Sequence, residues 1–119
     1  MSQTASTLTR TLAGATLAFT MSAAPVMAGD DAQIKKGAEV YAAQKCQMCH
    51  AIAGKGSKAN PLDGVGKKLT ADDTKAWIVT PVEMTAKTKS TKKPPMPAKY
   101  GSLPAADLDA LVAYLQSLK

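Results

Sequence analysis

Hydrophobic residues recur at helical spacing in two well-separated stretches of the chain. Between Asp31 and about Lys45, one helical face collects Ile34, Gly37, Ala38 and Tyr41, and Asp30 or Asp31 is placed to cap the start. Near the end, Pro104 suits a first helical turn and is followed by an apolar stripe of Leu108, Leu111, Val112, Leu115 and Leu118. These patterns predict a first and a last helix, each with one apolar face to bury.

The stretch between these helices has weaker patterns. Thr70 is placed to cap a short helix that ends at Thr80 before Pro81, with Asp72 and Asp73 in its first turn and Trp77 on its apolar side. Residues 51–69 contain many glycines and prolines and predict a loop without regular structure. Residues 81–101 lack a hydrophobic period and predict a second loop, stiffened around Met96 by Pro94, Pro95 and Pro97. No stretch has a strand pattern, so the predicted fold class is all-α.

The first 28 residues have the pattern of a cleavable signal peptide. Arg10 provides a positive start, residues 12–19 form a short apolar core, and Ala28 ends a segment suited to peptidase cleavage. The alternative is a membrane anchor, but the apolar core is too short to span a bilayer, and no later apolar run is long enough. We therefore expect residues 1–28 to be a signal peptide, residues 29–119 to be the mature domain, and the protein to be periplasmic and not membrane-spanning.

Composition and charge narrow the function further. The mature chain is small and keeps only four aromatic residues, so a bound group would help it bury enough surface. Without Arg10 its net charge is +5, which favours partner proteins with acidic docking faces. A nucleic-acid role is the competing interpretation, but the chain has neither a basic helix nor an aromatic stacking platform, and an exported protein meets little nucleic acid.

Cys46-Gln47-Met48-Cys49-His50 is a C-x-x-C-H run, the pattern of c-type haem attachment. Two thiols at this spacing match the two vinyl groups of one haem, and the next residue is an imidazole for the iron. Three alternatives are a zinc site, a redox dithiol and a plain disulfide. Zinc needs four ligands and the run offers three, a redox dithiol belongs beside a βαβ sheet, and a disulfide closing so short a loop would leave His50 unexplained.

The second axial ligand is not a histidine, because His50 is the chain's single histidine. Met96 is the preferred candidate, since it lies in the proline-rich loop and far from His50 in sequence. Met84 is the second candidate, and an open coordination position is the third. Either methionine also has a simpler interpretation as a packing residue.

With these residues, the mature chain resembles a class I cytochrome c of the small bacterial periplasmic type. The resemblance implies terminal helices that cross at Gly37 and Tyr41 against Leu111 and Tyr114, and one haem c attached through Cys46 and Cys49. It also implies that the segment Asn60-Pro61-Leu62 holds the His50 ring through a backbone carbonyl, so that Pro61 orients His50. Met96 would be the distal ligand, and Trp77 would reach a haem propionate. The implied function is that of a monomeric electron carrier rather than an enzyme. The alternatives are a haem subunit of a periplasmic oxidoreductase complex and a ligand-binding or peroxidase haem protein.

Overall fold

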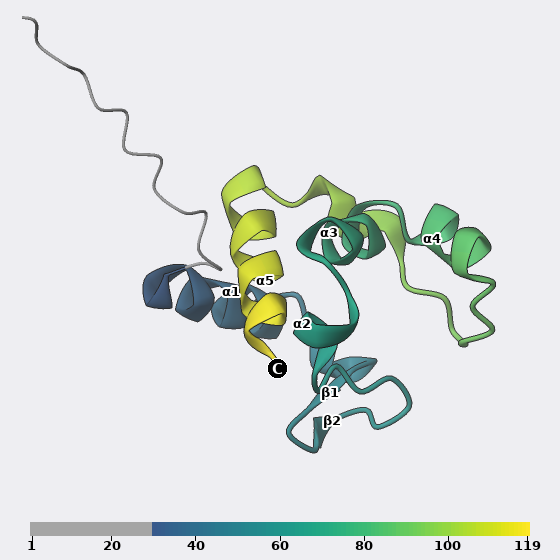
Figure 1. Cartoon of the computed structure of the whole chain (residues 1–119), viewed down its shortest axis with the longest axis horizontal. Helices are drawn as coiled ribbons and strands as arrows, with labels where there is room; N and C mark the ends of the chain where they lie inside the picture. The colour runs from purple at the N-terminus through teal and green to yellow at the C-terminus, as the bar shows by residue number, and fades with distance from the viewer. Residues whose placement is uncertain (1–29) are drawn as a thin grey trace, which may run out of the picture.

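The computed structural model describes residues 30–119, and the predicted signal peptide lies outside this range. Figure 1 shows a helical domain with one small hairpin. The helices are α1 (Asp31–Ala43), α2 (Val65–Lys68), α3 (Ala71–Val79), α4 (Pro81–Thr88) and α5 (Ala105–Ser117), with 3-10 turns η1 (Cys46–Met48) and η2 (Ala98–Ser102). Strands β1 (Ala51–Ile52) and β2 (Lys55–Gly56) form an antiparallel pair. The all-α prediction is confirmed, because only these two very short strands interrupt the helical architecture.

Helices α1 and α5 cross and pack against each other, as the resemblance implies. Gly37 makes this close approach possible, because a Cβ atom there would overlap the Ala110 carbonyl and lie 2.6 Å from Cβ of Tyr114. Tyr41 and Tyr114 meet edge to face across the two helices, with ring centroids 5.8 Å apart. The terminal helices are therefore a fixed pair on which the rest of the domain is built.

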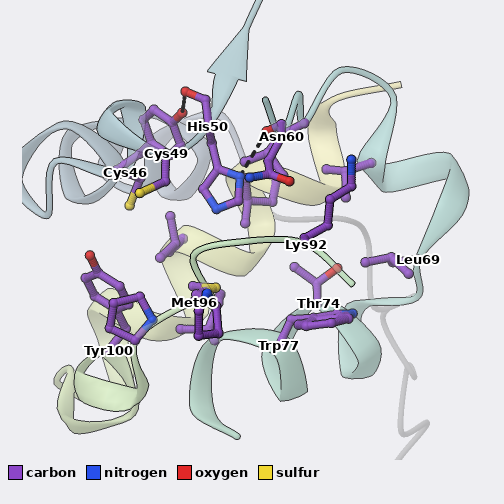
Figure 2. A pocket seen from close by; sticks show the side chains of 18 of the residues that line it. Cys46, Cys49, His50, Asn60, Leu69, Thr74, Trp77, Lys92, Met96 and Tyr100 are labelled. Atoms are coloured by element: carbon purple, nitrogen blue, oxygen red, sulfur yellow. Dashed lines mark hydrogen bonds between the residues drawn. The ribbon is translucent and has the colours of Figure 1, made fainter. Parts of the chain in front are cut away.

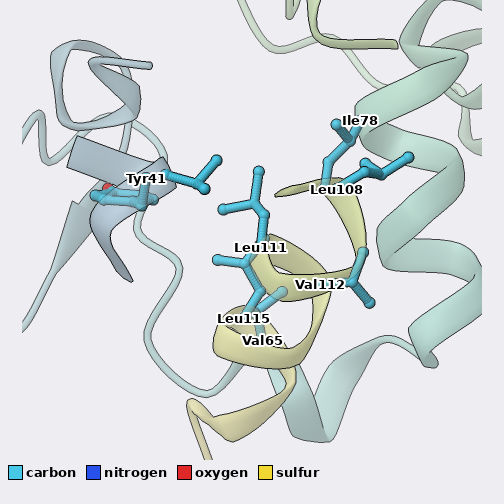
Figure 3. Close-up of a cluster of buried hydrophobic side chains, with 8 residues drawn as sticks. Tyr41, Val65, Ile78, Leu108, Leu111, Val112 and Leu115 are labelled. Carbon is cyan, nitrogen blue, oxygen red and sulfur yellow. The ribbon is translucent and has the colours of Figure 1, made fainter. Parts of the chain in front are cut away.

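The core lies between α5 and the elements around it (Figure 3). The predicted apolar stripe of α5 is confirmed from Leu108 to Leu115, while Leu118 is only half-buried at its end. The side chain of Gln116 ties α5 to α3, because its amide donates to the carbonyl of Leu69 at 3.1 Å and to Oγ1 of Thr74 at 2.9 Å. Thr74 is 2% exposed, so this contact satisfies a buried hydroxyl. The core members are Val40, Tyr41, Val65, Ile78, Leu108, Leu111, Val112 and Leu115.

Both predicted helix starts that depend on capping are present. Oδ1 of Asp30 accepts from the backbone N–H of Gln33 at 2.8 Å, and Oγ1 of Thr70 accepts from that of Asp73 at 3.1 Å. These side chains satisfy backbone donors that the first turn of a helix leaves without partners. The α3 cap sets the start of the helix that carries Trp77.

The prediction that residues 81–101 form a loop was wrong for the first part of that stretch. Pro81 ends α3 and also begins α4, because its fixed φ and missing N–H suit a first helical position. Only Pro81 and Met84 of α4 are buried, and two buried positions are too few to show a period in the sequence. The helix ends where Lys89 adopts a left-handed backbone conformation, and the irregular segment 89–97 follows.

Residues 51–69 also contain regular structure that the sequence did not predict. β1 and β2 are joined by Ala53 and Gly54, which both have positive φ, as in a type I′ hairpin turn. The later part of the stretch forms α2, a single helical turn. Within residues 30–119 no helix is long and apolar enough to cross a membrane.

Candidate functional site

The domain contains a pocket of about 280 Å³ that opens beside the core (Figure 2). Its volume is just below the range for small-molecule sites, about 300–1,000 Å³. Segments far apart in sequence line it: the end of α1, the cysteine turn, α3, the segment 90–97 and α5. Much of the wall is apolar, including Leu62, Val65, Leu69, Ile78, Leu111 and Leu115. A group bound here would therefore complete the hydrophobic core.

A sharp turn brings the two cysteines together at one end of this pocket. Lys45 has a left-handed backbone conformation, φ 57°, which ends α1 and directs the chain into η1. The backbone N–H groups of Cys49 and His50 then both donate to the carbonyl of Cys46, at 3.1 and 2.9 Å. Both thiols are free, with Cys46 half-buried and Cys49 exposed. Figure 2 shows both sulfur-bearing side chains at the same end of the pocket.

The ring of His50 is held by a backbone carbonyl. Its Nδ1 lies 3.0 Å from the carbonyl oxygen of Asn60. A carbonyl only accepts, so Nδ1 carries the proton and Nε2 keeps its lone pair for a metal. The hydroxyl of Tyr41 donates to the His50 carbonyl at 3.3 Å, which holds the backbone of the same residue.

The residue that orients His50 is therefore Asn60, one position before the predicted Pro61. Pro61 does not line the pocket; it forms an isolated bridge with Ala51, next to the bond from the Leu62 N–H to the Ala51 carbonyl. Its effect on Asn60 is indirect, because a residue before proline is restricted to extended backbone conformations. The resemblance points to a backbone carbonyl of this segment, and in the structure the contact is made by that of Asn60.

Met96 faces His50 across the pocket. The half-buried side chain comes from between Pro95 and Pro97, and Figure 2 shows it on the opposite side of the pocket from the imidazole. Met84 is 7% exposed and lies on the buried side of α4, and it is not part of the pocket wall. Trp77 reaches the pocket from α3. The structure thus brings together five of the six predicted site residues, and places Pro61 just outside.

The sequence that forms this site matches a known protein family. The family model described as Cytochrome c matches residues 34–119, which is most of the chain and includes the whole pocket. The chain belongs to the cytochrome c family. Comparisons with curated proteins and with solved structures gave no match. Family membership makes this cytochrome c an electron-transfer haem protein, with haem c attached covalently through the cysteine pair.

The pocket of the cytochrome fits this cofactor. Two free thiols lie at one end, a histidine nitrogen with a lone pair is available beside them, and the remaining wall is largely apolar. Cys46 and Cys49 are the chain's only cysteines, so they are the residues that form the two thioether bonds.

The alternatives for the C-x-x-C-H run find no support in the described residues. No group of three or more His, Cys, Asp or Glu side chains within residues 30–119 is arranged to hold a metal ion by itself. Burial raises the pKa of the Cys46 thiol above its ordinary value. A redox dithiol needs the opposite shift, because its thiolate is the reactive form. The strands β1 and β2 form an antiparallel pair, and not the parallel βαβ sheet beside which a redox dithiol belongs.

Proposed function

We propose that this cytochrome c is a periplasmic monohaem electron carrier whose iron is ligated by His50 and Met96. The observation that carries the proposal is the position of these two side chains on opposite sides of one pocket, with both cysteines at its end (Figure 2). When bound, the haem supplies an iron that changes oxidation state by one electron. With His50 and Met96 as its ligands, the iron would have no position left for a substrate, which favours electron transfer over catalysis.

The protein's own residues support this role in two ways. The Asn60 carbonyl fixes the His50 ring, which keeps the ligand geometry similar in both oxidation states. The prolines on either side of Met96 restrict the backbone that carries the second ligand. A thioether ligand favours ferrous iron. Ligation by histidine and methionine therefore gives a higher reduction potential than other sets of haem ligands.

Trp77 would donate a hydrogen bond to a haem carboxylate. It lines the pocket from α3, away from the cysteines, and its indole N–H is a donor that suits a carboxylate oxygen. The Gln116 contact to Thr74 holds the helix that carries it.

The test of the iron ligation is the visible spectrum of the reduced holoprotein before and after addition of carbon monoxide. We expect a low-spin spectrum that carbon monoxide leaves unchanged, and haem that stays bound after denaturation. A spectrum that changes promptly with carbon monoxide would show an open iron and would favour the ligand-binding or peroxidase alternative.

Exposed lysines around the pocket support transient docking of acidic partners. Five of them lie on α4 and the segments that follow it, where Glu83 is the nearby acid in sequence, and three lie near the cysteines. Such a face attracts an acidic protein over about a Debye length, roughly 10 Å at 0.1 M salt. These lysines are Lys87, Lys89, Lys92, Lys93 and Lys99, with Lys45, Lys55 and Lys58 on the cysteine side.

We expect electron exchange with an acidic redox protein to slow roughly tenfold as salt rises from 10 to 300 mM, because added ions screen this attraction. Stopped-flow kinetics with a purified acidic partner measures the rate, and a neutral small-molecule reductant is the control that salt should leave unaffected. Equal rates at both salt concentrations with the protein partner would contradict the docking proposal.

A further inference from the structure

The charged side chains that line the pocket are unevenly distributed. No carboxylate lines it, and two lysines do, Lys45 and Lys92. The other titratable groups of the wall are Tyr41, Cys46, Cys49, His50 and Tyr100. The pocket of this chain is therefore able to accept a ligand that brings negative charge of its own.

The two lysines differ in position. Lys45 directly precedes Cys46, so its backbone is at the attachment end. Lys92 comes from the segment between α4 and Met96. Figure 2 shows it on the side of the pocket away from the cysteines, with its ammonium group pointing toward the Asn60 side. Ser90, whose Oγ accepts from the Lys92 backbone N–H at 3.4 Å, lines the pocket with it.

No carboxylate of residues 30–119 forms an ion pair with Lys92. The ion pairs of the described range join Lys36 to Asp107 at 3.2 Å and Lys75 to Asp109 at 3.0 Å. Lys92 takes part in neither pair, and its side chain borders the apolar wall of the pocket. Within residues 30–119 its charge thus has no partner from the protein itself.

A haem carries its two carboxylates on the edge remote from the vinyl groups that cysteines attach. With Cys46 and Cys49 holding one edge, the carboxylates would lie toward the other end of the pocket. We propose that Lys92 pairs with a haem carboxylate there, and so acts as a positioning residue that raises the reduction potential of the iron. This inference rests on the covalent haem and on the ligation proposed above.

The effect on potential follows from charge. An ionised haem carboxylate stabilises the more positive ferric state, and an adjacent ammonium group offsets that negative charge. The same ammonium group favours the ionised form of the carboxylate, so the carboxylate titrates at a lower pH than it would alone. Lys92 is exposed, so both effects are those of a pair at the pocket rim and not of a buried ion pair.

The experiment compares holoproteins carrying Lys92→Gln, Lys93→Gln and Lys92→Arg with the unmodified protein. Lys93 is the matched control, because it is the adjacent exposed lysine and does not line the pocket. The reduction potential of each is measured by equilibrium titration from pH 5 to 9. We expect Lys92→Gln to lower the potential at pH 7 more than Lys93→Gln does. We also expect it to move the pH-dependent step upward by about half a pH unit.

Lys92→Arg should leave the potential and the pH-dependent step as they are in the unmodified protein, because it keeps the charge. Equal potentials and equal pH steps in the two glutamine variants would overturn the proposal. Each sample is also tested with carbon monoxide before titration. An unmodified protein that binds carbon monoxide would count against the His50/Met96 ligation, whereas a sealed iron with no Lys92 effect would count against the carboxylate pairing alone.

Discussion

Replacement of both Cys46 and Cys49 by alanine is expected to abolish covalent haem attachment completely. These are the chain's only thiols, they lie one turn apart at the end of the pocket, and no other side chain forms a thioether with a vinyl group. Denaturation followed by acidic organic extraction measures the bound haem. The unmodified protein should keep its haem with the polypeptide, and the double variant should release all of it. Each single variant should retain one bond.

Met48→Ala is the matched control for these cysteine variants. Met48 lies between the cysteines in the same turn, and its side chain is 72% exposed, so its removal changes the segment without touching either sulfur or the core. Its haem should resist extraction as in the unmodified protein. Haem that resists extraction from the double variant would show that attachment uses another group, and the site described above would then be wrong.

The double cysteine variant should also lose stability. Leu111 and Leu115 belong to the hydrophobic core and also line the haem pocket. A chain that does not retain its haem leaves these apolar surfaces in contact with water, and a domain of this size has little other surface to bury. Far-ultraviolet circular dichroism during thermal unfolding should show a lower midpoint for the double variant than for Met48→Ala.

The parts of this structure that the sequence predicted are those encoded by short, repeated or local signals. Helices α1 and α5 show a 3.6-residue period, and Asp30 and Thr70 are capping residues directly before their helices. The C-x-x-C-H run is local as well, since one turn of chain places both thiols and the imidazole. The role of Gly37 came from the resemblance to the cytochrome c family, whose terminal helices cross where a glycine permits close approach.

The parts that it did not predict depend on single tertiary contacts. α4 buries Pro81 and Met84 alone, so its sequence has no period, and it leads directly into a stretch rich in lysine and proline that is typical of a loop. The carbonyl that orients His50 was expected in the segment Asn60-Pro61-Leu62, but the folded backbone decides that Asn60 and not Pro61 makes the contact. Lys92 is one of several lysines in its stretch of sequence, and only the folded segment before Met96 brings it to the pocket wall. No local signal separates such residues from their neighbours.

Met96→Leu is expected to open the iron to carbon monoxide and to lower the reduction potential by about 0.2 V, part of the roughly 0.8 V range that axial ligands span. Leucine keeps nearly the same volume, so the pocket wall stays filled while the thioether is lost. The reduction potential falls because the thioether, which favours ferrous iron, is lost. Carbon monoxide difference spectra and equilibrium redox titration of the same holoprotein measure the two effects.

Met84→Leu distinguishes ligation from packing. Met84 is more deeply buried than Met96 but lies outside the pocket wall, so this volume-conserving change should cost less than about 1.5 kcal/mol of stability and leave the iron sealed. If Met84→Leu opened the iron and Met96→Leu did not, the sixth ligand would be Met84, and α4 would have to move toward the pocket when haem is attached. If Met96→Leu alone opens it, the proline-rich segment is what closes the second face, and the choice between electron carrier and ligand-binding protein depends on this one side chain.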